Sequence, residues 1–244
     1  MTGYVKHEVE WTPEKVGRLW DHYGAISAFR PLYFSAHSGA AIGARADAEL
    51  GLSGKRVLDF GAGHGDLLAH LFERGVAASA LEFSERSARS VWDRFASEPL
   101  FGGIEVAEGL PSPYPTGSFD VVFLVEVAEH LLDEQVAPTV REVQRLLAPG
   151  GHVVVTVPNA EELLFEQVHC PDCGATFHRW QHQRSLTAPS LAEMFDVFEP
   201  VHVEALDWLE AKRAPLRRLL RRSTARPHLF YAGRTPTTST TLPP

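Results

Sequence analysis

The sequence predicts an α/β protein with a doubly wound, mostly parallel sheet. Apolar, strand-like runs alternate with amphipathic, helix-like stretches from about residue 12 to residue 234. Strands that alternate with crossover helices form a parallel sheet with helices on both faces, and the connections here are as short as such units require. With 244 residues, 44% hydrophobic and 22% charged, the chain has the composition of a globular protein with a sizeable core.

Two helices are expected ahead of the sheet. Thr12 can cap the first helix and Pro13 suits its first position, and an apolar stripe continues from there to Gly24. A second helix is expected over 40–50. We therefore expect residues 1–50 to form an N-terminal helical cap.

The elements of the sheet follow in order. Strands are expected over 56–60, 78–83, 104–109, 119–127 and 152–158. Helices over 66–75 and 84–95, and a helix followed by a turn over 136–151, lie between them. A helix over 188–195 precedes two strands over 199–206 and 228–234, which would close the sheet as an antiparallel pair and bring it to seven strands. The predicted domain spans 51–234, and the low-complexity tail 235–244 is expected to be disordered.

Charge and hydropathy limit the classes of partner and the location that we expect for the protein. The formal net charge of −8 at pH 7 does not favour nucleic acid as a partner, although the segment 212–226 holds seven Lys and Arg and no acid. That segment is either a solvated surface helix or a patch that faces an anionic ligand. No apolar run approaches the roughly 20 residues of a membrane span, and the first residues lack the layout of a signal peptide. We therefore expect a cytoplasmic protein without a membrane span.

A glycine-rich loop follows the first strand of the sheet. The stretch "VLDFGAGHGDL" (57–67) has glycine at every second position, namely Gly61, Gly63 and Gly65. A dinucleotide-binding loop would have its third glycine at position 66, where Asp66 stands, and a carboxylate there disfavours the phosphates that bind at a helix N-terminus. The loop therefore predicts a cationic nucleoside without phosphates, whose ribose Glu82 can bind from the end of the next strand.

Four segments in order resemble the class I S-adenosylmethionine-dependent methyltransferases, in particular those that act on quinones and small molecules. The segments are "VLDFGAGHG", "LEFS", "GLPSPYPTGSFDVVFLVEVAEHL" and "LLAPGGHVVVTVPN", and the resemblance covers about residues 55–160. It implies a Rossmann-like fold and S-adenosylmethionine as cofactor.

The resemblance also implies roles in cofactor binding. The three loop glycines would line the methionine part, with Asp59 holding the loop or the amino group of the cofactor and Glu82 the ribose. Around the adenine and the reactive end, the residues implied are Phe83 beside the adenine, Ala107 or Glu108 near its edge, and Glu126 beneath the reactive end.

The stretch "EVAEH" (126–130) ends the fourth strand, where open α/β sheets bind their ligands. Methyl transfer needs an aligned acceptor and a base where the acceptor carries a proton. His130, whose unperturbed pKa lies near neutrality, and Glu129 are the candidate catalytic residues. We expect methyl transfer to a small-molecule acceptor, at oxygen.

Two alternatives stay open. Methyltransferases of the 3′-terminal ribose of small RNAs use Glu-x-x-Glu-His and a later histidine to bind a divalent metal over two hydroxyls, a pattern that is matched by Glu126, Glu129, His130 and His182. The other alternative is a scaffold that binds S-adenosylmethionine without catalysis.

A cysteine- and histidine-rich insertion is expected over 168–184. Its spacing, Cys170-x2-Cys173-x4-His178-x3-His182, can close a tetrahedral structural zinc site, and His169 could replace one histidine. A redox thiol pair and two unliganded cysteines are the alternatives. If His182 binds zinc, it cannot also serve the acceptor.

Overall fold

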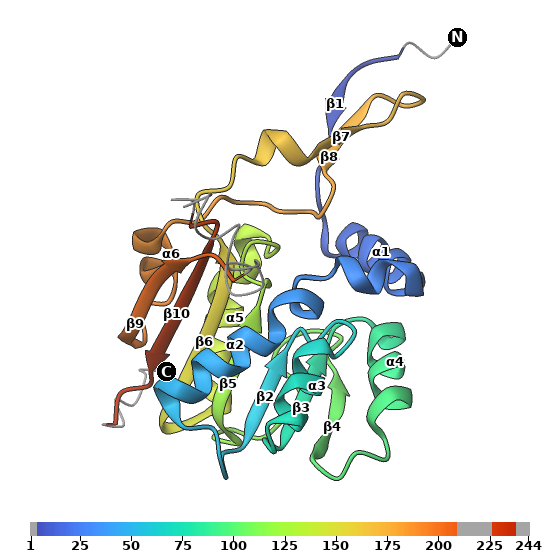
Figure 1. Ribbon diagram of the computed structural model, residues 1–244. Coiled ribbons are helices and arrows are strands. Elements are labelled where there is room, and N and C mark those ends of the chain that lie inside the picture. Colours follow the sequence, from blue (N-terminus) through green and yellow to red (C-terminus); the bar gives the residue numbers. More distant parts are fainter. Residues whose placement is uncertain (1–3, 209–225, 238–244) are drawn as a thin grey trace, which may run out of the picture.

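The computed structural model describes residues 4–208 and 226–237. At its centre lies a seven-stranded sheet with the strand order β4–β3–β2–β5–β6–β10–β9 (Figure 1). The strands are β2 (Val57–Phe60), β3 (Ala78–Glu82), β4 (Phe101–Val106), β5 (Phe119–Val125), β6 (Leu147–Pro158), β9 (Glu199–Leu206) and β10 (His228–Arg234). The predicted α/β class and the mostly parallel, seven-stranded sheet are confirmed.

One strand of the sheet runs against the others. The five strands from β4 to β6 are parallel to one another, whereas β10 is antiparallel to both β6 and β9. The predicted closing pair is confirmed over the predicted residues. From β2 the chain adds β3 and β4 on one side, and β5 and β6 lie on the other. Such a switch point leaves a crevice at the carboxyl ends of the central strands.

Helices cover both faces of the sheet. They are α2 (Phe34–Leu50), α3 (Asp66–Glu73), α4 (Glu85–Phe95), α5 (Asp133–Leu146) and α6 (Ala188–Met194). Two helices precede them, α1 (Pro13–Gly24), which has no buried residue, and η1 (Ser27–Leu32). Side chains of α2, α3 and α4 form one buried core with the sheet, and those of α5 and α6 form a second core. Along β5, Val121 and Phe123 enter the first core, whereas Val122 and Leu124 enter the second. Burial on both faces explains why this strand is a continuous apolar run.

Several predicted boundaries differ from the structure, and the larger differences are in three places. The second helix begins at Phe34 rather than 40, and its buried residues Ile42 and Ala46 pack in the core that includes α3. The third strand begins at Phe101, whose ring packs near those of α3 and α4, because the glycines that follow resemble a turn in sequence although they lie in the strand. Within 136–151, where a helix and then a turn are expected, the helix ends at Leu146 and β6 begins directly after it in place of the turn.

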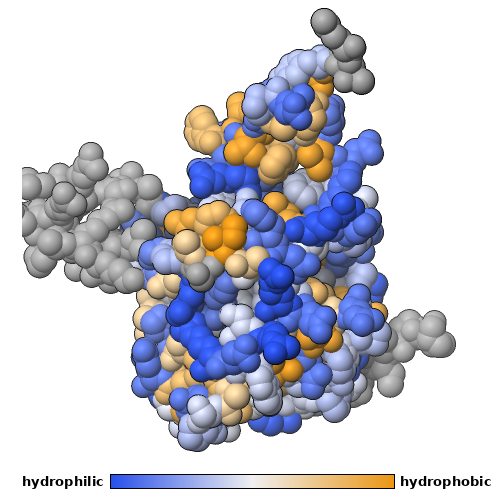
Figure 2. All heavy atoms as spheres, turned by 90° about the vertical axis from the view of Figure 1, so that its right-hand side faces the viewer, coloured by the Kyte–Doolittle hydropathy of each residue, from blue (hydrophilic) through white to orange (hydrophobic). Residues whose placement is uncertain are grey.

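A small second sheet stands apart from the first (Figure 1). Strand β8 (Ala175–His178) pairs with β7 (Gln167–His169) in an antiparallel hairpin and with β1 (His7–Glu8) in parallel. We call residues 4–9 and 161–185, which include this sheet and η2 (Leu163–Glu166), the arm. Figure 2 shows hydrophobic side chains gathered on its surface, and the exposed large ones are Tyr4, Val5, Leu164, Phe165 and Val168.

The remaining predictions concern the ends and the basic segment. Thr235, the first residue of the predicted disordered tail, is buried and donates its N–H to the carbonyl of Gly151. Residues 238–244 of that tail and nearly all of the basic segment 212–226 lie outside the described residues. Within the described part of the chain, no helix combines the length and hydropathy needed to cross a membrane.

Candidate functional site

The glycine loop between β2 and α3 lies against neighbours on two sides. Gly61 and Gly63 adopt positive φ angles of 81° and 54°. A Cβ atom at Gly61 would lie 2.9 Å from a methyl group of Val127, and one at Gly63 would lie 3.4 Å from the ring of Tyr33. Glycine is therefore required for the backbone conformation and for the close approach. The contact with Val127 also joins this loop to the one that follows β5.

The N-terminus of α3 already carries a paired carboxylate. Arg30 and Arg94 both reach Oδ1 of Asp66, at 2.7 and 2.8 Å, and Asp66 is 4% exposed. A phosphate would meet this carboxylate at the helix end that phosphates normally occupy. The geometry therefore agrees with a ligand that has no phosphates.

Glu82 ties the end of β3 to the glycine loop. Its carboxylate accepts hydrogen bonds from the N–H groups of Gly63 at 2.5 Å, Phe83 at 3.0 Å and Ser84 at 3.4 Å. Burial raises the pKa of Glu82, and the three N–H groups oppose that rise. Beside it a cavity of about 390 Å³ opens between α1 and the start of α4, lined by Gly17, Asp21, Phe83, Ser84, Glu85 and Arg86.

Asp59 lies at the end of β2 and is 2% exposed. Burial, followed by the negative charges of Glu82 and Asp66, raises its pKa to about 8. Its Oδ2 atom has no hydrogen-bond partner among the described residues. A buried carboxylate oxygen without a partner is costly unless a ligand supplies one, so these residues fit a ligand with an ammonium group. Glu108 is exposed in the turn after β4, and its role at the adenine edge stays a prediction.

Two glutamates follow β5, of which Glu126 is half-buried and Glu129 is buried. Glu126 has a φ of 54° and accepts a hydrogen bond from the Thr156 hydroxyl at 3.0 Å. Burial raises its pKa to about 8, against the effect of that hydroxyl. Glu129 is 1% exposed, and neither carboxylate oxygen has a partner with hydrogen-bond geometry among the described residues. Burial, and then the adjacent Glu126, raise its pKa well above the usual range.

His130 lies beside Glu129 in a dry environment. Its Nε2 atom is 3.9 Å from Oε1 of Glu129, and its ring packs edge-on against Trp20. Burial, and then the charge of His182, lower the pKa of His130 to about 3. Desolvation therefore favours the uncharged imidazole, and the role of His130 as a base stays a prediction.

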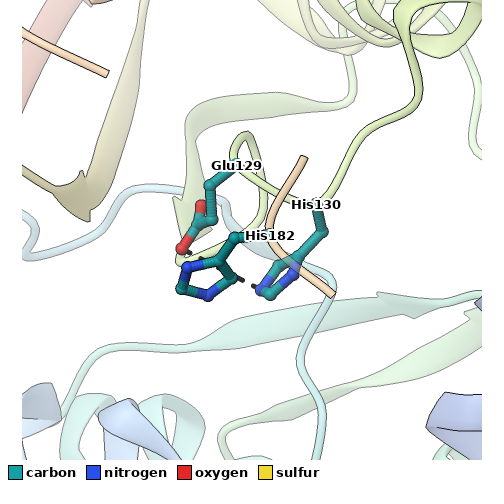
Figure 3. Close-up of side chains that lie close together, drawn as sticks. All are labelled: Glu129, His130 and His182. Atoms are coloured by element: carbon teal, nitrogen blue, oxygen red, sulfur yellow. Dashed lines mark ion pairs between the residues drawn. The ribbon is translucent and has the colours of Figure 1, made fainter. Parts of the chain in front are cut away.

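The arm brings His182 to this place. The N–H of Gln183 donates to the carbonyl of Glu129 at 2.8 Å, and the Gln181 amide donates to the carbonyl of His130 at 2.8 Å. Figure 3 shows Glu129, His130 and His182 directed toward one another. One potential ligand atom from each lies within 4.8 Å of the others. The arm is thus part of the site.

Two further residues of the arm, which sequence reasoning missed or assigned elsewhere, contact His182. Glu161 bonds through Oε2 to Nδ1 of His182 at 2.5 Å, and its Oε1 lies 3.6 Å from Nε2 of His178. Burial alone would raise the pKa of Glu161, but these two imidazoles lower it to about 2. Its place three residues after β6, the strand next to β5, was the available signal in the sequence.

The predicted four-ligand zinc site is not formed. Cys170 and Cys173 occupy the turn of the β7–β8 hairpin, in which Gly174 donates its N–H to the carbonyl of Cys170. His178 lies at the opposite end of β8, about 10 Å along the strand at the usual rise per residue, and neighbours Glu161 and His182 instead. Within the described residues, no cluster of potential metal ligands includes either cysteine. His169 instead bonds to the hydroxyl of Tyr4.

Comparisons with known proteins agree with this geometry. Residues 37–198 match the methyltransferase domain family. The chain is 33% identical over 119 residues to the ubiquinone biosynthesis O-methyltransferase of Pseudomonas aeruginosa, covering 46% of this chain and 48% of that protein. It is 25% identical over 189 residues to the 27-O-demethylrifamycin SV methyltransferase of Amycolatopsis mediterranei, covering 65% and 68%. The chain thus spans about half the length of the ubiquinone relative that it matches.

Solved structures share the fold. The 1,6-didemethyltoxoflavin-N1-methyltransferase of Burkholderia thailandensis has a TM-score of 0.66 and 17% identity, covering 96% of this chain and 94% of that one. The [4+2]-cyclase SpnF has a TM-score of 0.59 and 18% identity, covering 82% of each chain. The fold therefore does not by itself determine the reaction. The match to the family over two thirds of the chain does determine its membership: the chain belongs to the class I S-adenosylmethionine-dependent methyltransferases.

Proposed function

We propose that the protein transfers the methyl group of S-adenosylmethionine to a hydroxyl oxygen of a small-molecule acceptor. One observation carries the proposal. Glu129, buried and without a hydrogen-bond partner among the described residues, lies after β5 in a loop that contacts the glycine loop. The names of the relatives, which include O-methyltransferases of ubiquinone biosynthesis and of tocopherol, support oxygen as the atom and a small molecule as the acceptor.

The glycine loop and its carboxylates would hold the cofactor. S-adenosylmethionine supplies a methyl group on a positively charged sulfur, which is ready to be displaced. The unpartnered Oδ2 of Asp59 can pair with the ammonium group. Glu82 keeps one acceptor position on Oε1 for a ribose hydroxyl, because Oε1 accepts only from Gly63 and each carboxylate oxygen can accept two hydrogen bonds. Phe83, 48% exposed beside the cavity, offers a face to the adenine.

The residues after β5 would receive the acceptor. An acceptor hydroxyl can donate to a carboxylate oxygen of Glu129, and the uncharged His130 lies beside that carboxylate. The ring of Trp20 packs against both His130 and Tyr33, and Tyr33 packs against the glycine loop. This aromatic wall connects the two halves of the crevice and would keep water from the reacting groups.

A turnover assay tests the proposal. The purified chain is incubated with S-adenosylmethionine and a panel of quinols, phenols and aliphatic alcohols, and separately with RNA that has a free 3′ end. We expect S-adenosylhomocysteine and a methyl ether product with the small molecules. Binding of the cofactor without turnover would favour a scaffold, methylation of RNA alone would favour the RNA alternative, and methylation at nitrogen or carbon would contradict oxygen as the acceptor atom.

A further inference from the structure

We propose that Glu129, His130 and His182 form a binding site for a first-row divalent metal ion at the acceptor end of the crevice. The metal's role in catalysis rests on the proposed function, whereas its binding does not. The three side chains come from the loop after β5 and from the arm, and they converge as Figure 3 shows. One potential ligand atom from each lies within 4.8 Å of the other two.

A second observation, independent of these distances, also supports the metal site: the cluster contains buried polar atoms without hydrogen-bond partners. Glu129 is 1% exposed, and both of its carboxylate oxygens have no hydrogen-bond partner among the described residues. The Nε2 atom of His130 lies 3.9 Å from Oε1 of Glu129, too far for a hydrogen bond. Buried polar atoms are nearly always satisfied in folded proteins. A cation would satisfy the carboxylate and an imidazole nitrogen at once.

A second cluster, Glu161, His178 and His182, competes for His182. Glu161 lies between its two imidazoles, and Nε2 of His178 has no hydrogen-bond partner among the described residues. Glu161 has one oxygen 2.5 Å from Nδ1 of His182 and the other 3.6 Å from Nε2 of His178. The rings of His178 and His182 stack with centroids 4.3 Å apart. Because Nδ1 of His182 is engaged by Glu161, its Nε2 is the nitrogen available to a metal. Carboxylates commonly hold metal-binding histidines in this way, so we assign Glu161 as a positioning residue.

The donor set indicates the class of metal. Two imidazoles and one carboxylate suit Mn²⁺, Fe²⁺, Co²⁺ or Zn²⁺, whereas Mg²⁺ and Ca²⁺ prefer oxygen ligands alone. Three protein ligands also leave coordination positions open. Those positions would face the place that the proposed function gives to the acceptor, so the preferred acceptors would be those with two adjacent oxygen atoms.

Titration with Mn²⁺ tests the site without any substrate. The full chain is stripped with EDTA, and free Mn²⁺ is measured by electron paramagnetic resonance as the protein is added. We expect one ion per chain. Glu129→Gln and His182→Ala should each weaken binding by about 100-fold or more, and Glu161→Gln by about 10-fold, because an outer partner matters less than a ligand.

Glu134→Gln is the matched control, since Glu134 is an exposed acid in the first turn of α5. Cofactor binding by each variant, measured by calorimetry, shows that the fold is intact. Equal Mn²⁺ affinity in Glu129→Gln and Glu134→Gln would overturn the site, as would loss of binding in Glu161→Gln alone, which would place the ion in the second cluster. If the chain binds no Mn²⁺ and methyl transfer persists in EDTA, the metal site is contradicted. The proposed function would remain supported in that case.

Discussion

Two buried glutamates at the same edge of the sheet have opposite surroundings. Glu82, at the end of β3, is 8% exposed and accepts hydrogen bonds from three backbone N–H groups. Glu129, after β5, is 1% exposed and has no such partner among the described residues. Backbone N–H groups thus offset the burial of the first carboxylate, whereas the second lies against the carboxyl group of Glu126, which raises its pKa further.

The difference lies in what each acid contacts within its half of the crevice. Backbone hydrogen bonds fix Glu82 to the glycine loop, whereas Asp59 in the same cofactor half keeps an unpartnered Oδ2 for the ligand. The acceptor half holds Glu129 and His130 against the arm with polar atoms left over, which a ligand must satisfy. Substitutions in the two halves should therefore have separable effects on cofactor binding and on turnover.

The largest effect is expected from Glu129→Gln. The change keeps the shape of the side chain and removes its charge, so we expect kcat/KM for the acceptor to fall by about 100-fold or more, the usual scale for losing an acid–base group or its equivalent. The dissociation constant of S-adenosylmethionine should stay within about twofold, because the cofactor half does not use this carboxylate. A parallel fall in cofactor affinity would contradict the separation of the halves.

A smaller effect is expected from Glu161→Gln. Loss of this charge frees the ring of His182 to turn, and we expect kcat/KM to fall by about 10-fold, in the range known for outer partners of functional histidines. Glu162→Gln is the control, because the neighbouring acid caps η2 instead. If the two variants behaved alike, Glu161 would have no positioning role.

Asp59 offers a test through pH. Its folded pKa of about 8 lies above the unfolded value of about 3.9, so between these values the folded chain holds a proton that the unfolded chain has released. This group therefore makes the ligand-free protein less stable as pH rises from about 4 to 8. Asp59→Asn should reduce the difference between urea midpoints at pH 5 and pH 8. An unchanged difference would show that Asp59 is ionised in the fold.

The smallest effect concerns a pair far from both halves. A hydrogen bond from Arg56 lowers the pKa of Asp120, so the pair stabilises the fold above the unfolded pKa of about 3.9, and this contribution is lost as pH falls through the lower folded value. Because both side chains are partly exposed, Asp120→Asn should cost only about 0.5 kcal/mol at pH 7. Chemical unfolding should show that the difference in unfolding free energy between the wild type and Asp120→Asn disappears toward pH 3. A difference that stays constant with pH would mean that it comes from packing and not from the charge.

The fold was largely predictable because each strand and helix carries its own pattern. The apolar run that ends at Val125 and the capped helix after Thr12 required no knowledge of distant partners. The pairing of β1 with β8 was not predictable, since two residues, His7 and Glu8, carry no periodicity and gain their strand geometry from the arm. Likewise, β4 begins before its glycines only because Phe101 packs against two helices.

The candidate site likewise contains residues whose places could be predicted from the sequence and residues whose places could not. The separation of Glu82 from the glycine loop is characteristic in sequence, and the structure places the two in contact. His182 was assigned with the cysteines because it is close to them in sequence, but Gln183 binds the backbone of Glu129 and places His182 beside His130. Glu161 has no motif around it and depends on the adjacency of β5 and β6, which becomes known only with the topology.

Calorimetric titration with S-adenosylmethionine tests the central claim, that the loop after β2 and the acid after β3 hold the cofactor. We predict one site per chain in the wild type and in Glu129→Gln, and at least about 100-fold weaker binding in Glu82→Ala, which removes the acid proposed to bind the ribose and the acceptor for the Gly63 N–H. Failure of the wild type to bind, or wild-type affinity in Glu82→Ala, would contradict the account.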